Sequence, residues 1–414
     1  MPVTVDHQAK AFYFTMSKIV IVGNGVAGDT AANKVARSGA EHDVTVISAE
    51  SYPFYQRTRL GEILSERAEP DELILHDTDW YESRNISLFL EEKVTDIHPQ
   101  SKSVSTASGE SISYDKLLLA TGAEPVVPPI AGLEKRNVYT LRTLEDVLEI
   151  ESRLPEVEEA AVIGGGLLGL ESAYGLNQRG INLHVIEALP TVMGKQLDKT
   201  GSHQVRSRLE KEGIEFRLGA EAARLNGERK VRSVNLSTGE EIPADLVVIS
   251  VGVSPRTELA AGGGIKTSRG IVVDECLQTS LPDIYAAGDV IEQDGQCYGI
   301  WPPAQEQGKI AGKNLLGAGE TYDGSLSYYK LKVANIDLIS AGVRDESAAA
   351  TVIAREEETE NTYKKFFLDE KGELIGAILV GDGSNHAKVL NGLRKSSKFE
   401  QLNKDQELIK SDVN

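Results

Sequence analysis

The chain has 414 residues, of which 40% are hydrophobic, and carries a formal net charge of −19. This length predicts about three domains, and the acidic charge argues against nucleic acid or an anionic membrane as a partner. No apolar run approaches the roughly 18 residues of a membrane-spanning helix. The first fifteen residues lack the charged start and long apolar stretch of a signal peptide. We expect residues 1–16 to be a disordered leader or an over-extended start.

The first predicted unit is a strand, a glycine-rich turn and a helix. Residues 18–22 form a strand that is apolar after Lys18, and three glycines follow at the spacing Gly-x-Gly-x-x-Gly, namely Gly23, Gly25 and Gly28. In this pattern the first glycine allows a tight turn, the second lets backbone approach a pyrophosphate, and the third lets helix pack on strand. Another strand at 43–48 leads to Glu50, where a carboxylate can bond adenosine ribose hydroxyls. The unit predicts a dinucleotide site; alternatively, the glycines serve only the turn.

The second predicted unit repeats this pattern. Its glycines are Gly164, Gly166 and Gly169, and a strand at 182–186 leads to Glu187. A carboxylate at this place would repel a 2′-phosphate, and none of the four residues after it is basic. The unit therefore predicts a preference for NADH over NADPH, unless another loop supplies a cation. Two dinucleotides in one chain suggest electron transfer between them.

The rest of the chain alternates strands and helices around a short linker. Residues 126–130 contain two prolines, which is typical of a crossover connection. Further strands are expected at 245–251 and 270–274, and within 328–342 and 362–380, with a helix at 385–399. The fold class is therefore predicted to be α/β, with two Rossmann-like three-layer dinucleotide-binding domains, one inserted in the other, and a small α+β C-terminal domain.

Two further motifs carry a resemblance to a known family. Residues 119–123 contain Thr121 and Gly122, and residues 279–289 end in Gly288 and Asp289. With the two glycine fingerprints, these motifs resemble the FAD-dependent pyridine nucleotide reductases of the glutathione reductase type over residues 17–325. The resemblance implies FAD at the first fingerprint, with Asp289 on the ribityl chain, and NADH at the second, with Gly252 as a cofactor contact.

The resemblance also implies a division into domains. Residues 17–125 and 253–325 would form the FAD-binding domain, 126–252 the NAD-binding domain, and 326–414 the C-terminal α+β domain. Residues 55–63, 331–342, 376–382 and 393–399 are similar to the NADH:rubredoxin oxidoreductase branch, and nitrite reductase large subunits share parts of this similarity. Thr58 replaces a usual proline, and Glu62 a usual lysine of ferredoxin reductases, which leaves the flavin contacts there open.

Several side chains have both a functional and a structural interpretation. Arg57 and Arg59 could contact the FAD phosphates or be solvated loop residues. Glu171 could lie near the nicotinamide or on a helix surface, and Glu62 could lie near the flavin or on a helix surface. Trp301, with residues 305–308, could line the flavin or fill the core, and Lys332 is a weaker candidate of this kind.

The number and positions of the cysteines limit the reactions in which a thiol could take part. The chain has only two, Cys276 and Cys297, which exclude a disulfide framework and fit a reducing cytoplasm. Thiol catalysis needs a thiol beside the flavin, and none precedes residue 276, so we expect no catalytic side chain. The seven histidines show no metal-ligand spacing, so no metal site is predicted.

These features predict an NADH:acceptor oxidoreductase with FAD, most simply a rubredoxin reductase. The alternatives are a reductase component for a ferredoxin or nitrite-reducing partner, and a redox sensor that binds FAD and NAD. Residues 386–398 hold Lys388, Arg394, Lys395 and Lys398 but no acid. This segment could dock a small acidic electron carrier or be a solvated helix face. For the protein as a whole we expect a monomer or a homodimer.

Overall fold

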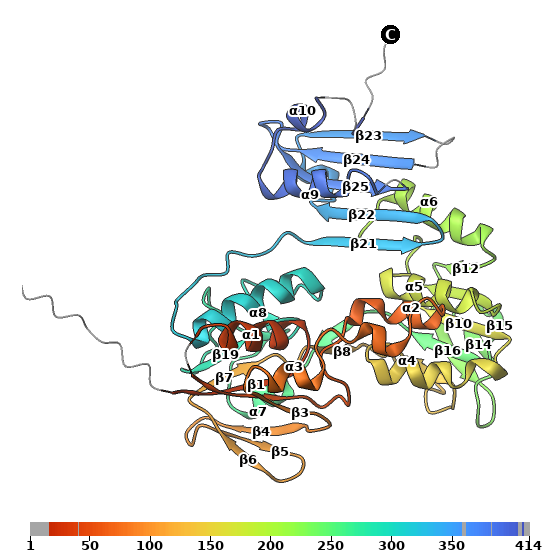
Figure 1. Cartoon of the computed structure of the whole chain (residues 1–414). Coiled ribbons are helices and arrows are strands. Elements are labelled where there is room, and N and C mark those ends of the chain that lie inside the picture. The colour runs from red at the N-terminus through yellow and green to blue at the C-terminus, as the bar shows by residue number, and fades with distance from the viewer. Residues whose placement is uncertain (1–15, 40, 358–361, 382, 405–407, 410–414) are drawn as a thin grey trace, which may run out of the picture.

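The computed structural model describes residues 16–39, 41–357, 362–381, 383–404 and 408–409. Apart from Met16, the expected leader lies outside the described residues. Three sheets organise the described part of the chain, with the C-terminal sheet lying above the other two in the view of Figure 1.

The first sheet is parallel and has the first fingerprint strand at its centre. Its order is β19 (Ile284–Ala286), β7 (Lys116–Leu119), β1 (Lys18–Val22), β2 (Asp43–Ile47) and β3 (Ile86–Phe89). Associated elements are α1 (Val26–Ala36), α3 (Thr78–Glu82), α7 (Glu258–Gly262), α8 (Trp301–Leu315), and the antiparallel strands β4 (Val94–His98), β5 (Ser103–Thr106) and β6 (Ser111–Ser113). Its strands are nearly continuously apolar, as expected of a parallel sheet covered on both faces.

The second sheet repeats this arrangement around the second fingerprint strand. Its order is β12 (Glu215–Leu218), β11 (Asn182–Glu187), β10 (Glu159–Ile163), β16 (Leu246–Ile249) and β9 (Val138–Thr140), all parallel. Associated elements are α4 (Leu144–Glu151), α5 (Leu167–Asn177), α6 (Lys199–Lys211), and the antiparallel strands β13 (Ala222–Asn226), β14 (Ser233–Leu236) and β15 (Glu241–Pro243). In both sheets the order reverses beside the fingerprint strand, which is where α/β sheets bind ligands.

Two antiparallel strands, β8 (Ala123–Pro125) and β17 (Val253–Pro255), connect the two sheets. The strands β18 (Ile271–Val272) and β20 (Ile291–Glu292) form a short parallel pair. The strand expected at 270–274 is therefore only two residues long. The helix α2 (Leu60–Leu64) belongs to the first unit in sequence but packs on α5 and α4 of the second.

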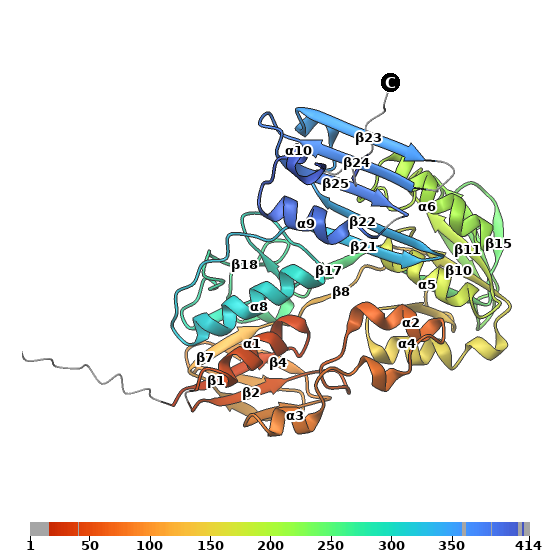
Figure 2. The ribbon, with the colours of Figure 1, turned by 45° about the horizontal axis from the view of Figure 1, so that its top comes forward.

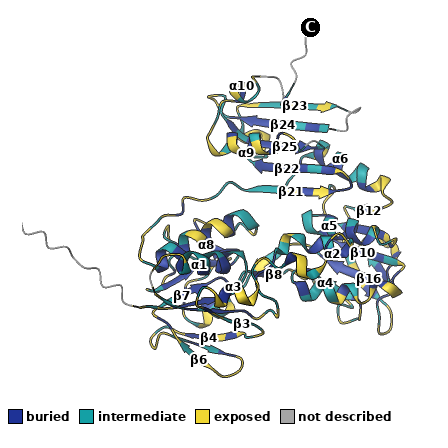
Figure 3. Cartoon of the chain, in the orientation of Figure 1, coloured by how far each residue is buried: buried dark blue, intermediate teal, exposed yellow. Residues whose placement is uncertain are grey.

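The C-terminal sheet is antiparallel and lies between two apolar layers. Its order is β21 (Tyr328–Val333), β22 (Ile336–Gly342), β25 (Leu374–Val380), β24 (Thr362–Leu368) and β23 (Thr351–Glu357). Alternate residues face opposite ways: Leu338, Phe367 and Ile378 join the core of the second sheet, and Ile339 and Phe366 join α9 (His386–Arg394) and α10 (Phe399–Leu402). Figure 3 shows the buried residues concentrated in the sheets and on inward helix faces. The α/β class with two Rossmann-like domains and a C-terminal α+β domain is thus confirmed.

At the C-terminus the strands expected within 328–342 and 362–380 are present, but three details were not predicted. The stretch 328–342 is a hairpin, because Ala334 and Asn335 have φ of 48° and 56° and form a two-residue turn. The sequence analysis missed the edge strand β23. The helix expected at 385–399 ends at Arg394 and resumes as α10, because Ser396 has φ of 47° and lies outside the helical region.

Candidate functional site

Each fingerprint forms an open cradle at the start of a helix. In the first, a Cβ on Gly23 would lie 2.2 Å from the Ala120 carbonyl oxygen, and one on Gly28 would lie 1.9 Å from the Gly23 carbonyl oxygen. Gly25 instead faces open space, with no atom within 4 Å of a Cβ, and it begins α1 without any side-chain cap. The free N–H groups of the first turn are therefore available to an anion.

The second fingerprint has the same geometry. Gly164 and Gly169 are closed in by backbone, whereas Gly166 faces open space and begins α5 without a side-chain cap. Behind the turn, Glu187 accepts the N–H of Gly165 through Oε2 at 2.7 Å and the N–H of Leu189 through Oε1 at 2.8 Å. Both cradles therefore fit a dinucleotide pyrophosphate, and Glu187 is held at the end of β11 beside the second.

Four charged residues from distant parts of the chain form one group near the first cradle. Glu50 pairs with Arg57 at 2.6 Å, and Asp289 pairs with Arg142 at 2.7 Å. The two pairs are joined because Arg57 also donates to the Arg142 carbonyl. Tyr55 donates to Glu50 at 2.5 Å. Burial raises the pKa of this phenol, and the negative charge of Glu50 raises it further. The structure thus brings together three residues that the sequence assigned to FAD.

The other residues expected near FAD lie in two neighbouring segments. Trp301 begins α8 and stacks on Phe54 with 5.8 Å between ring centroids, and Gln307 accepts the N–H of Gly288 at 2.8 Å. On the crossover, the Gly122 carbonyl accepts the N–H of Arg256, and the Gly252 carbonyl accepts that of Val126. Thr121 lies beside Gly122 at the end of β7.

Arg59 does not join this group. Its guanidinium pairs with Glu62 at 2.8 Å on α2, which packs on α5. Glu171 lies at this contact, where a Cβ on Gly61 would lie 3.5 Å from the Cβ of Glu171. Burial raises the pKa of Glu171 to about 8; the charge of Arg67 opposes the shift and that of Glu62 adds to it. Arg59, Glu62 and Glu171 therefore belong to the second fingerprint's surroundings.

Lys332 lies on β21, and the two cysteines lie in the segment between β18 and α8. Lys332 is exposed on β21. Burial raises the pKa of the Cys276 and Cys297 thiols, and their charged neighbours are Asp274, Glu275, Arg269 and Glu292. Among the described residues there is no cluster of His, Cys, Asp and Glu that could hold a metal. In the same part of the chain, no helix is long and apolar enough to cross a membrane.

The sequence analysis missed Arg142 and a polar cluster under the first turn. Buried Asp29 accepts from Tyr81 at 2.7 Å and lies 2.8 Å from Nδ1 of His76, and Tyr81 also donates to Asn24. The Asn24 Nδ2 group is buried without a partner, which leaves a donor available beside the cradle. The position of Asp29 directly after Gly28 could have indicated this cluster in the sequence. Arg142 lies in no motif, so no sequence signal pointed to it.

Comparisons with known proteins agree with this geometry. Residues 17–308 match the pyridine nucleotide-disulphide oxidoreductase family, and residues 328–397 match the rubredoxin NAD+ reductase C-terminal domain. The chain belongs to the pyridine nucleotide-disulphide oxidoreductase family. Its members related to NADH-rubredoxin oxidoreductase are flavoproteins that use FAD and NADH, so the expected cofactors and the expected resemblance are confirmed.

Three relatives illustrate the range of the family. The chain is 37% identical over 381 residues to the assimilatory nitrate reductase electron transfer subunit of Bacillus subtilis, covering 91% of this chain and 49% of the relative. It is 31% identical over 386 residues to the NADH-rubredoxin oxidoreductase of Clostridium acetobutylicum, covering 93% of this chain and 97% of the relative. A ferredoxin reductase from Rhodopseudomonas palustris superposes with a TM-score of 0.83 at 28% identity, covering 90% and 93%. The chain thus spans about half the length of the Bacillus subtilis relatives it matches.

Proposed function

We propose that the protein takes a hydride from NADH, passes the electrons through FAD and delivers them to an external acceptor, in the first instance rubredoxin. The observation that carries this proposal is the absence of cysteine from residues 1–275 in a chain with two open dinucleotide cradles. Disulfide chemistry needs a thiol beside the flavin. An acceptor outside the chain is the remaining destination for the electrons.

The chain's own residues bind and orient, and no side-chain acid or base is required. When bound, FAD accepts the hydride and releases single electrons. The N–H groups at the starts of α1 and α5, beside Gly25 and Gly166, would hold the two pyrophosphates. The packing of α2 on α5 joins the first unit to the second. We assign the cofactor contacts to Gly23, Gly25, Gly28, Glu50, Arg57, Arg59, Thr121, Gly122, Gly164, Gly166, Gly169, Glu171, Glu187, Gly252, Gly288, Asp289 and Trp301, and we add Arg142.

The proposal also divides the chain into domains and places the protein in a cell compartment. We propose that residues 17–125 and 253–325 form the FAD-binding domain, 126–252 the NAD-binding domain and 326–414 the C-terminal domain. The return of the chain to the first sheet through β19 supports the boundary near 253. A reducing cytoplasm belongs to the proposal because Cys276 and Cys297 are unpaired.

A second candidate acceptor is a ferredoxin or a nitrite-reducing partner. The 36% identity to the nitrite reductase of Bacillus subtilis favours the nitrite-reducing partner. An assay of NADH oxidation against rubredoxin, ferredoxin, nitrite and oxygen separates the candidates. We expect the highest kcat/KM with rubredoxin. Reduction of a dye but of no carrier protein would contradict the proposal and favour a redox sensor.

The basic segment 386–398 is proposed as the docking site for an acidic carrier. Arg394, Lys395 and Lys398 are exposed, within a chain whose net charge is −19. Replacing these three by Glu should slow carrier reduction, and the loss should shrink as salt screens the encounter. Reduction of a neutral dye is the control. If carrier and dye rates fall together, the segment supports the fold instead, and if neither falls, the carrier docks elsewhere.

A further inference from the structure

The loop at residues 188–197 joins Glu187 to α6, and its first end is bonded to the second fingerprint. Gly165 is held on both sides there: its N–H donates to Glu187 at 2.7 Å, and its carbonyl accepts the N–H of Met193 at 2.8 Å. The position of the fingerprint turn relative to Glu187 therefore depends on where this loop holds Met193.

Met193 is in a backbone conformation that the surroundings must maintain. Its φ is 50°, in the left-handed region that costs free energy for a residue with a Cβ. Its side chain is 1% exposed, and the N–H groups of Gln196 and Leu197 donate back to its carbonyl. Such a turn keeps its shape only while the loop's far end is fixed.

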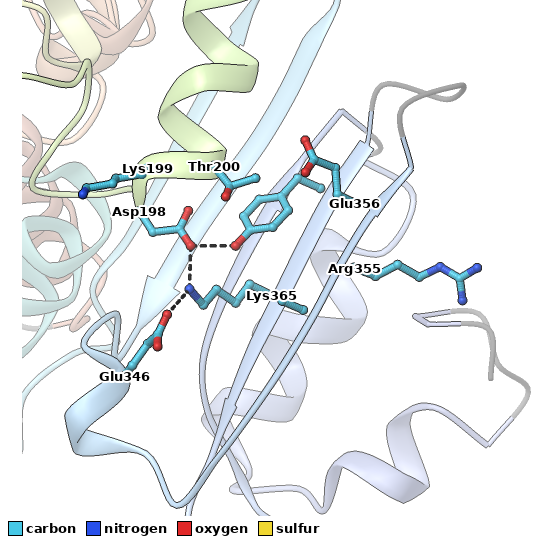
Figure 4. Close-up of a pocket in the computed structure, with 9 residues that line it drawn as sticks. Asp198, Lys199, Thr200, Glu346, Arg355, Glu356 and Lys365 are labelled. Carbon is cyan, nitrogen blue, oxygen red and sulfur yellow. Dashed lines mark hydrogen bonds and ion pairs between the residues drawn. The ribbon is translucent and has the colours of Figure 1, made fainter. Parts of the chain in front are cut away.

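The far end is fixed by the C-terminal sheet. Ser340 on β22 is fully buried and donates to the Gln196 carbonyl at 2.5 Å. Two residues later, Asp198 caps α6 by accepting the N–H of Gly201 at 2.9 Å. Its other oxygen accepts from Tyr363 at 2.6 Å and from Lys365 at 2.5 Å, both on β24. Figure 4 shows Lys365 reaching from the sheet to Asp198 on one side and Glu346 on the other.

The lysine at the centre of this cluster is buried and doubly paired. Lys365 is only 4% exposed, so its charge is satisfied by Asp198 and by Glu346 at 2.6 Å. Burial opposes ionisation of Asp198, but the bonds from Lys365 and Tyr363 outweigh it and lower the pKa of that carboxyl. The cluster stands beside a pocket of about 520 Å³, and a continuous apolar core joins the second sheet to this face of the C-terminal sheet. Figure 2 shows α6 beside the C-terminal sheet, where it contacts β24 and β25.

We propose that the C-terminal domain positions the adenosine side of the NADH site. Ser340 and the cluster of Asp198, Tyr363 and Lys365 hold the loop at 188–197, and the loop holds Gly165 and Glu187. Ser340 and Lys365 are positioning residues that touch no nucleotide. The proposal deepens the proposed function and depends on NADH binding at the second fingerprint.

The test uses ADP-ribose, which carries the adenosine half of NADH but no reactive ring. Ser340→Ala and Lys365→Met are made in the full chain with FAD bound, and Kd for ADP-ribose is measured by calorimetry. We expect both variants to raise this Kd at least fivefold and to raise KM for NADH with kcat for dye reduction nearly unchanged. FAD content should equal that of the wild type.

Gln204→Ala is the matched control. Gln204 crosses the same interface, from α6 to Glu356 on β23 at 2.6 Å, but does not touch the loop. Its ADP-ribose Kd should stay within twofold of the wild type.

A fall in thermal stability with unchanged Kd in both variants would overturn the proposal, because the cluster would then serve only the fold. Absence of ADP-ribose binding by the wild type would overturn it too. If Lys365→Met does not fold, Ser340→Ala alone decides. Failure to reduce rubredoxin, with ADP-ribose binding intact and sensitive to these substitutions, would refute the proposed acceptor and support the positioning role.

Discussion

Arg142 and Asp289 form an ion pair of 2.7 Å although 147 residues separate them in the sequence. Arg142 follows β9 of the second sheet, whereas Asp289 follows β19 of the first. A residue of one unit thus orients the carboxylate assigned to FAD in the other. The Arg142 carbonyl also accepts from Arg57, which pairs with Glu50, so both carboxylates beside the first cradle are fixed through one segment.

The first prediction is that Arg142→Met weakens FAD binding. Without the guanidinium, Asp289 loses its partner and its fixed orientation. We expect Kd of the apoprotein for FAD to rise about tenfold, roughly 1.4 kcal/mol, measured by quenching of flavin fluorescence. Arg232→Met removes an ion pair with Asp245 in the second unit and should leave this Kd unchanged. Equal FAD affinity in wild type and Arg142→Met would contradict the assigned role.

The second prediction concerns the choice between nicotinamide cofactors. Glu187 is held by two N–H groups at the end of β11, where it would repel a 2′-phosphate. Glu187→Ala combined with Ala188→Arg should shift the ratio of kcat/KM values toward NADPH by at least tenfold. The wild type is measured in parallel with both cofactors. Equal wild-type values for NADH and NADPH would show that Glu187 does not discriminate.

The third prediction is that neither thiol takes part in turnover. Burial raises the pKa of both thiols, which disfavours the reactive thiolate. A protein carrying Cys276→Ser and Cys297→Ser should keep its NADH-dependent dye reduction. A hundredfold loss with FAD still bound, about 2.7 kcal/mol of barrier, would refute this prediction.

The fourth prediction is a pH dependence of stability that originates at Glu171. Because burial raises its pKa from 4.5 to about 8, the folded protein keeps a proton that the unfolded chain releases. The unfolded state therefore binds fewer protons between these values, and the free energy of unfolding falls as pH rises through this window, by at most about 1.4 kcal/mol per pH unit.

Glu171→Gln removes this term, so the variant should gain stability relative to the wild type between pH 5 and pH 8. Urea unfolding at several pH values measures the difference. Glu149→Gln, at an exposed position on α4, is the control and should run parallel to the wild type. A variant curve parallel to that of the wild type would mean that Glu171 is ionised in the folded protein.

The cradles could be predicted from the sequence because their geometry is local. A Cβ on Gly28 would meet the carbonyl of Gly23, five residues earlier in the same turn, so spacing alone sets this contact. The contact of Gly23 with Ala120 forms only once β7 has paired with β1. The two acidic residues are local in the same sense: Glu50 follows β2 and Glu187 ends β11, the strands next to the two fingerprint strands. The hairpin at Ala334 and Asn335 escaped prediction because a turn with positive φ was formed without glycine.

The sequence by itself determined that the chain has two dinucleotide cradles, an acidic residue beside each and no thiol before residue 276. These features need only short stretches of chain, where spacing dictates which backbone groups meet. The tertiary structure alone decided that Arg142 meets Asp289 and that Lys365 meets Asp198, 167 residues away. No spacing rule reaches so far, because these pairs form only once separate sheets have packed and buried the apolar faces between them.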